Sequence, residues 1–164
     1  CHNVNFDFNP IIEEVLKRAV RLSRFPVILK LSPDFDYLAH ARLAEANGVA
    51  AISAINTIKG LRLNPDSGAP LLKNRYGGLS GRAIKPIGLR VVSELREAGI
   101  RLPIIAGGGV RTFSDVREYG WAGADAASLG SEAWLKPLWS MPLAPFHALH
   151  IRRLIGQVEG WSPR

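Results

Sequence analysis

The sequence predicts an α/β protein built on parallel strands, and three observations support this class. Short apolar runs alternate along the chain with segments of helical periodicity. No tight turn joins successive strands of this alternation, so the connections are long enough for right-handed crossovers. The 164 residues, 47% hydrophobic and 21% charged, have the composition of one globular domain. We therefore treat residues 1–164 as a single domain.

The first elements follow this alternation closely. Residues 9–23 carry apolar side chains at helical spacing and predict an amphipathic helix. Residues 25–31, FPVILKL, predict a buried strand. A second helix is expected from Asp36 to about Asn47, and a second strand over residues 49–55, VAAISAI.

A hairpin is expected to interrupt the alternation. Residues 60–72, GLRLNPDSGAPLL, have strand-like flanks around a Pro-Asp-Ser-Gly turn. Because the two flanks are short and close in sequence, they predict a small antiparallel excursion from the parallel sheet.

The pattern then resumes to the end of the chain. We expect three helices, over residues 83–98, from Thr112 or Ser114 to about Ala122, and over 143–157, and two strands, over 102–107 and 124–131. Pro86 fits the first of these helices only within its first turn. Four strand–helix units are half of an eight-fold α/β barrel, which needs about 250 residues. A small, doubly wound open sheet has the same strand pattern and remains the alternative.

The positive charge of the chain is dispersed. The formal net charge is +7 and the sequence pI is near 10.1. The arginines and lysines are scattered, and no basic stripe is flanked by aromatic residues, so we expect no nucleic-acid partner. The apolar runs are too short to cross a bilayer and no signal peptide is recognisable, so we expect no membrane association.

Cysteine and histidine usage limits two further classes. A single cysteine excludes an internal disulfide framework, which fits a reducing compartment and predicts a cytoplasmic protein. The four histidines show no ligand spacing with carboxylates or with Cys1, so we expect no metal site. The chain begins with Cys1 rather than methionine, and we expect it to be part of a longer protein.

Glycines mark the places where a ligand is expected. The last two strands end in "AGGGV", with Gly107, Gly108 and Gly109, and in "LGS", with Gly130. The loop "NRYGGLSGRAIKP" brings Gly77, Gly78 and Gly81 just ahead of another helix. Bare backbone and unpaired N–H groups at a helix start form an anion site, and eight-fold barrels commonly bind phosphate in their last loops. The sequence therefore predicts a phosphate site, which the phosphate of a cofactor or of a phosphorylated substrate would occupy.

Polar residues follow two other strands. Lys30 interrupts the apolar run of 25–31, so we expect it to face an anion or a polar pocket, the alternative being a strand-end lysine that reaches water. Asn56 and Thr57 follow the second strand and suit hydrogen bonding to a heterocyclic ligand, although turns also use such residues.

The chain resembles the dihydroorotate dehydrogenases, flavin enzymes of pyrimidine synthesis, in six motifs that run in order from Cys1 to Ser131: CHNV, PVILKLSP, AINT, GGLSGRAIKP, IIAGGGV and ASLGS. The resemblance covers only the second half of that family's (β/α)8 TIM barrel, in its soluble class with a cysteine base. It implies that FMN lies across the barrel mouth, with Lys30 at the pyrimidine edge of the flavin and Ile55 against the ring. It also implies a set of phosphate-holding residues: Gly81, Gly108, Gly109, Gly130 and Ser131.

The same resemblance implies the chemistry at the substrate. Cys1 aligns with the base that takes a proton from C5 of dihydroorotate while hydride leaves C6 for the flavin. Asn3, Asn56 and Thr57 match residues that hydrogen-bond the orotate ring. His2 stands where the family usually has proline, which leaves a related dihydropyrimidine as an alternative substrate.

The absent half of the barrel bears on partners and on activity. A half-barrel leaves unpaired sheet edges, so we expect the chain to pair with itself or with an N-terminal half on another chain. We expect no activity from this chain alone. The alternative is a non-catalytic half-barrel subunit that binds phosphate or flavin.

Overall fold

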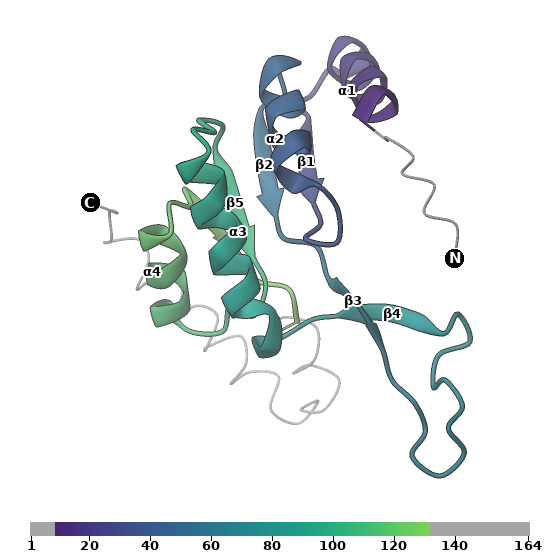
Figure 1. Ribbon diagram of the computed structural model, residues 1–164. Coiled ribbons are helices and arrows are strands. Elements are labelled where there is room, and N and C mark those ends of the chain that lie inside the picture. The colour runs from purple at the N-terminus through teal and green to yellow at the C-terminus, as the bar shows by residue number, and fades with distance from the viewer. Residues whose placement is uncertain (1–8, 132–164) are drawn as a thin grey trace.

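The computed structural model describes residues 9–131 (Figure 1). Within this range the elements are α1 (Asn9–Leu22), β1 (Ile28–Leu31), α2 (Tyr37–Ala46), β2 (Ala51–Ala54), β3 (Ile58–Leu61), β4 (Tyr76–Leu79), a 3-10 turn η1 (Arg82–Ile84), α3 (Lys85–Glu97), β5 (Ile104–Gly107), α4 (Phe113–Trp121) and β6 (Ala126–Ser128). The helix expected over 143–157 lies outside the described residues.

The main sheet has four strands in the order β1-β2-β5-β6, and every neighbouring pair is parallel. A helix connects each strand of this sheet to the next. Between β2 and β5, the β3–β4 hairpin comes before the connecting helix α3. This confirms the prediction of parallel β/α units with a small hairpin excursion. The strand order equals the chain order, as in an arc of a barrel.

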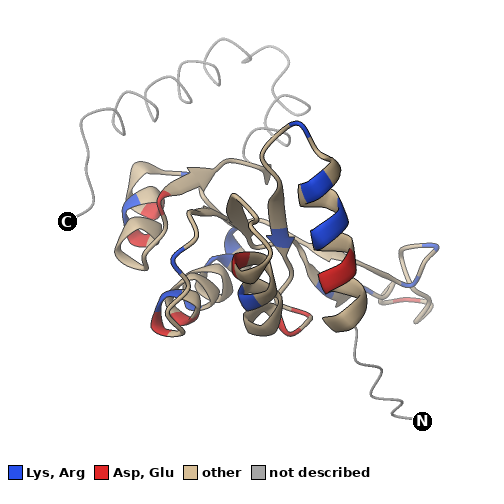
Figure 2. Ribbon diagram, turned by 90° about the horizontal axis from the view of Figure 1, so that it is seen from above, with Lys and Arg blue, Asp and Glu red and all other residues tan. Residues whose placement is uncertain are grey.

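All four helices cover one face of this sheet, as the view from above shows (Figure 2). The buried core lies between the helices and the sheet and contains Ile52, Ile104, Val91, Leu95 and Tyr119. Each of these side chains is fully buried. Burial of these apolar side chains is the main stabilising contribution to this layer pair.

The other face of the sheet is open among the described residues. Ile28 and Lys30 of β1 both point to it, because alternate residues of a strand share a face. Ile28 is 49% exposed, whereas Leu31, on the helix side, is 1% exposed. The expectation of a buried strand over 25–31 is therefore wrong in two respects: the strand starts at Ile28, and only one of its faces is covered. Phe25, ahead of the strand, is 80% exposed.

The hairpin is longer than its turn residues indicated and extends from residue 58 to residue 79. Its strands are β3 and β4, paired antiparallel with Ile58 opposite Leu79 and Leu61 opposite Tyr76. The predicted flanks contribute only the isolated bridge between Leu63 and Pro70 beyond β3. The hairpin projects from the body of the molecule (Figure 1).

The helix starts behave as the sequence indicates. Pro86 lies in the first turn of α3. Thr112, rather than Ser114, caps α4: its side chain accepts from the Asp115 N–H, and the Asp115 carboxylate accepts from the Thr112 N–H. This reciprocal capping box fixes the point where the chain leaves β5 and enters α4.

Candidate functional site

The carboxyl ends of the four parallel strands meet at one edge of the sheet, where α/β proteins bind ligands. Most of the predicted site residues lie just after a strand of the main sheet: Ile55, Asn56, Thr57, Gly108, Gly109, Gly130 and Ser131. Gly81 lies at the start of η1, and Lys30 is the residue before the last one of β1. Cys1 and Asn3 lie outside the described residues.

The two glycine loops are in direct contact. A Cβ added to Gly109 would lie 2.9 Å from the Gly81 carbonyl oxygen and 3.1 Å from Cα of Arg82. Gly109 has φ +73° and Gly81 has φ +85°, a region that L side chains rarely adopt. Glycine at position 109 is therefore required twice, by backbone conformation and by the closeness of the neighbouring loop.

These loops present unused backbone donors. Within residues 9–131, the N–H groups of Gly81, Gly108 and Gly109 donate to no protein acceptor. A Cβ on Gly81 would meet no atom within 4 Å, so the space beside this glycine is open. Unpaired N–H groups on two neighbouring loops that lead into helices can bind phosphate oxygens.

Ile55 and Asn56 join the neighbouring strand to this site. The Ile55 N–H donates to the Gly107 carbonyl at 3.1 Å, and the Asn56 N–H donates to Leu31 at 2.7 Å. The Ile55 side chain, 7% exposed, would lie 3.4 Å from a Cβ on Gly108. Ile55 therefore forms an apolar wall next to the glycine loop.

Thr57 lies against the hairpin. A Cβ on Gly78 of β4 would collide with the Thr57 side chain, so glycine there leaves room for the threonine. The Asn56 carboxamide oxygen accepts from the Thr57 N–H at 2.9 Å, and both residues are exposed. Gly77 and Gly78 thus lie in strand β4 rather than in the loop that the sequence indicated.

Lys30 and the loop after β6 are the remaining predicted positions at the carboxyl ends of the strands. Lys30 is exposed on the open face of the sheet, opposite Ser53 of β2, rather than enclosed in a polar pocket by the described residues. Gly130 follows β6, and a Cβ there would meet no atom within 4 Å. Lys30 therefore borders the face of the sheet that the described helices do not cover, and Gly130 has open space beside it.

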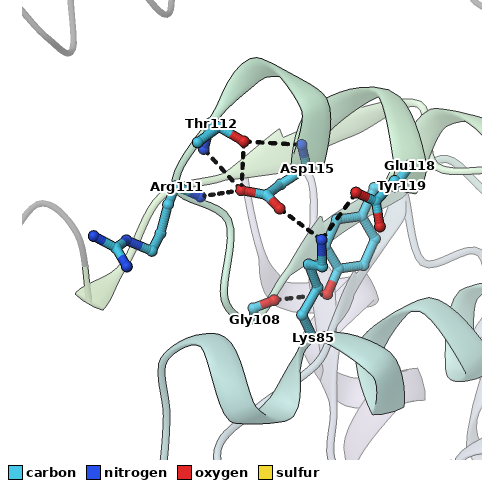
Figure 3. A network of polar contacts seen from close by, with 7 residues as sticks. All are labelled: Lys85, Gly108, Arg111, Thr112, Asp115, Glu118 and Tyr119. Carbon is cyan, nitrogen blue, oxygen red and sulfur yellow. Dashed lines mark hydrogen bonds and ion pairs between the residues drawn. The ribbon is translucent and has the colours of Figure 1, made fainter.

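Sequence reasoning missed a charged network behind the glycine loops (Figure 3). Lys85, the first residue of α3, contacts two carboxylates of α4: its Nζ lies 2.6 Å from Asp115 Oδ1 and 2.9 Å from Glu118 Oε1. The second oxygen of Asp115 accepts from the Arg111 N–H at 3.0 Å and from the Thr112 hydroxyl at 2.8 Å. One carboxylate thus joins α3 to the segment that follows Gly109.

The network shifts the ionisation of its members. Burial alone would raise the pKa of Asp115, but hydrogen bonds from Lys85, from the Arg111 N–H and from Thr112 outweigh it and lower the pKa to about 2. The hydrogen bond to Asp115 raises the pKa of Lys85. Burial, together with the nearby charges of Asp115 and Glu118, raises the pKa of Tyr119 to about 12. Lys85 and Asp115 are therefore charged, and Tyr119 is a neutral donor, at physiological pH.

A signal for this network was present in the sequence. A lysine in the first turn of a helix is opposed by the helix dipole, so it needs carboxylate partners. The spacing of Thr112 and Asp115 before an apolar run is that of a capping box. Neither signal alone shows that the two residues meet.

A comparison with protein families identifies the chain. Residues 4–142 match the family model described as dihydroorotate dehydrogenase. The chain belongs to the dihydroorotate dehydrogenase family. This confirms the family and the barrel fold inferred from the six motifs.

Curated relatives agree with this assignment. Catalytic subunits named dihydroorotate dehydrogenase B (NAD(+)) from Bacillus thuringiensis (strain Al Hakam), Bacillus mycoides (strain KBAB4) and Bacillus cereus (strain B4264) are each 40% identical to it over 144 residues. The alignment covers 84% of this chain and 46% of each relative. The chain thus spans about half the length of the curated relatives it matches.

Within residues 9–131, none of the helices combines the length and the apolar character that crossing a membrane requires. These residues also hold no group of three or more His, Cys, Asp or Glu side chains placed to bind a metal ion. His2, His147 and His150 lie outside the described range.

Proposed function

We propose that this chain supplies the phosphate-binding half of an FMN-dependent barrel that oxidises dihydroorotate to orotate. Membership of the dihydroorotate dehydrogenase family supports the reaction class. The observation that best supports FMN as the cofactor is the contact between the Gly81 and Gly109 loops, whose N–H groups have no protein acceptor among the described residues. A dianionic phosphate is the group that such donors bind best.

The residues present fit the parts of FMN. The backbone of Gly81, Gly108, Gly109, Gly130 and Ser131 would hold the phosphate. Ile55 offers an apolar surface for the flavin ring beside the phosphate loop. Lys30, exposed on the open face, would place its charge at the pyrimidine edge of the ring. FMN, when bound, supplies the acceptor for the hydride that leaves C6 of the substrate.

The substrate would be held by polar side chains and deprotonated by a thiolate. Asn56 and Thr57 are exposed at the end of β2 and offer a carboxamide and a hydroxyl to the carbonyl and N–H groups of a dihydropyrimidine ring. Asn3 would add a third contact. Cys1 would take the proton from C5, since a thiol can be tuned to ionise near neutral pH.

Pairing with a second half-barrel follows from the open sheet face. A parallel sheet is ordinarily covered on both faces, and β1 and β6 each end the four-strand order. We propose that another copy of this chain, or a chain carrying the first half of the barrel, covers that face. Light scattering tests this: a dimer or larger assembly is expected, and a monodisperse monomer that binds no hydrophobic dye contradicts it.

Reconstitution with FMN tests the cofactor. After removal of free flavin, the protein should retain the visible absorption of bound flavin, and colourless protein would refute FMN binding by this chain.

Addition of dihydroorotate then tests the reaction. Bleaching of the bound flavin indicates that the chain itself carries the activity, and Cys1→Ala should abolish the bleaching without weakening FMN binding. Retained colour in wild-type protein would instead assign the chain to a non-catalytic flavin-binding half-barrel.

A further inference from the structure

We infer that Lys85, acting through Asp115, is a positioning residue that holds the two glycine loops in the geometry that binds phosphate. This inference rests on the proposed FMN site and adds a residue to it that lies behind the loops. The assigned role is to fix the direction and the electrostatic surroundings of the backbone N–H groups, without contact between Lys85 and the ligand.

The first step is the position of Lys85. Only η1 separates it from Gly81, and its Cβ would lie 3.0 Å from a Cβ on Gly109. Its ammonium group turns to α4 and bonds Asp115 and Glu118 at 2.6 and 2.9 Å. The side chain is 23% exposed and that of Asp115 13%, so the ion pair is shielded enough to hold a defined geometry.

The second step is the relay through Asp115. Its Oδ1 accepts from Lys85, while its Oδ2 accepts from the N–H groups of Arg111 and Thr112 at 3.0 and 2.8 Å. A charged acceptor holds N–H donors more firmly than a neutral one. Asp115 thereby links Lys85 to the backbone at Arg111 and Thr112, shortly after Gly109 (Figure 3).

The third step fixes the peptide between Gly108 and Gly109. The buried Tyr119 hydroxyl donates to the Gly108 carbonyl at 2.8 Å. The C=O and N–H of a planar trans peptide point in opposite directions, so the Gly109 N–H points away from Tyr119. A Cβ on Gly88 of α3 would collide with this hydroxyl. Glycine at position 88 therefore leaves the space that the hydroxyl needs to reach the Gly108 carbonyl.

The fourth step is charge balance. Lys85 contributes one positive charge against the two negative charges of Asp115 and Glu118, which leaves the group at a net −1. Loss of Lys85 would leave two carboxylates behind a loop that must accept a dianion. Lys85 therefore orders the loop and also reduces the repulsion that a phosphate would meet there.

The test compares FMN with riboflavin, which lacks the phosphate. Dissociation constants for both are measured by flavin fluorescence on the full chain, as wild type and as Lys85→Met, Lys85→Arg and Glu118→Gln. The preference for FMN over riboflavin should fall at least tenfold in Lys85→Met, while riboflavin affinity stays within about twofold. Lys85→Arg should keep most of the preference, because it keeps the charge.

Glu118→Gln is the matched control. It removes one partner of Lys85 and one negative charge, but leaves the bonds that the N–H groups of Arg111 and Thr112 donate to Asp115, so the FMN preference should be retained or raised. An unchanged FMN preference in Lys85→Met would overturn the inference. An equal loss in Glu118→Gln would also overturn it, because the effect would then not run through Asp115.

Hydrogen exchange separates this inference from the proposed function. If wild-type protein shows no preference for FMN, the proposed cofactor is wrong, and the positioning role is judged from the backbone alone. The amides of Arg111 and Thr112, which donate to Asp115, should then exchange at least tenfold faster in Lys85→Met than in wild type, with Lys85→Arg close to wild type. Equal exchange rates would overturn the positioning role. If Lys85→Met does not fold, Asp115→Asn is compared with Glu118→Gln by the same criteria.

Discussion

Two basic residues of α3, one at each end of the helix, organise the two ends of the sheet in different ways. Among the residues that the structure describes, Lys85, at the carboxyl ends of the strands, bonds only the carboxylates of Asp115 and Glu118. Arg96, at the amino ends, donates to the carbonyl oxygens of Gly123, Ile100 and Leu102 at 2.8 to 2.9 Å. It also pairs with Asp125 at 2.6 Å.

The difference lies in what each network leaves unpaired. Around Arg96, backbone carbonyls are paired, and Asp125 also accepts from the Ile104 N–H at 2.7 Å. Around Lys85, the bonded backbone begins at Arg111, and only Val110 separates it from Gly109. The N–H groups of Gly108 and Gly109 have no acceptor within residues 9–131. We therefore expect the amino end to serve stability and the carboxyl end to bind a ligand, which is the division known in eight-fold barrels.

The largest effect is expected from a matched pair of glycine substitutions. Gly109→Ala places a Cβ 2.9 Å from the Gly81 carbonyl at a positive φ, so FMN affinity should fall about a hundredfold or more, equivalent to about 2.7 kcal/mol. Gly123→Ala is equally strained, with its Cβ 2.5 Å from Cγ of Arg96, but lies at the other end of the strands. It should lower the unfolding free energy and leave FMN affinity unchanged in fluorescence titrations. Equal losses of affinity would erase the distinction between the two ends.

Arg96→Met should have the next largest effect. It leaves three carbonyl oxygens and Asp125 without their donor, which costs about 2 to 3 kcal/mol of unfolding free energy. Urea denaturation followed by circular dichroism measures this loss. The FMN-to-riboflavin affinity ratio should not change, and a change in that ratio would show that the amino end also shapes the ligand site.

Asp115 predicts a pH dependence specific to the carboxyl end. Because its pKa is lowered to about 2 in the folded chain, its contribution is complete above the unfolded value near 4 and is lost as the pH falls from there to about 2. The shift corresponds to about 2 kcal/mol. Asp115→Asn should therefore lose less stability than wild type between pH 4 and pH 2 in denaturant titrations. Parallel curves for the two proteins would contradict the assigned ion pair.

Tyr119→Phe should give the smallest effect. It removes the donor to the Gly108 carbonyl, which costs about 1 kcal/mol of stability, and it frees the peptide that orients the Gly109 N–H. FMN affinity should fall a few-fold, while riboflavin affinity is unchanged. If both flavins weaken equally, the hydroxyl supports the fold without orienting the phosphate donors.

The sequence predicted the parallel units, and it marked the glycine loops, because local signals decide both features. Gly109 follows a buried run and precedes a cap, and those patterns are contained in a few neighbouring positions. Lys85 was missed because its partners lie 30 and 33 residues away and meet it only when α3 and α4 pack together. A lysine in a helix otherwise indicates a solvated surface.

The second strand of the hairpin was also misassigned from the sequence. Gly77 and Gly78 are poor strand formers, so β4 was interpreted as a loop. Tertiary packing overrides the propensity: the side chains of Leu72 and Thr57 occupy the space that a Cβ at each glycine would need. A single sequence does not show which distant side chain fills such a gap.

Backbone NMR of the 15N-labelled chain tests phosphate binding by the glycine loops most directly. On addition of FMN, the amide signals of Gly81, Gly108 and Gly109 should shift strongly, as expected when N–H groups begin to donate to phosphate oxygens. Riboflavin at the same saturation should leave these three signals in place. If FMN leaves them unshifted while it binds, or if riboflavin shifts them equally, the glycine loops do not hold the phosphate.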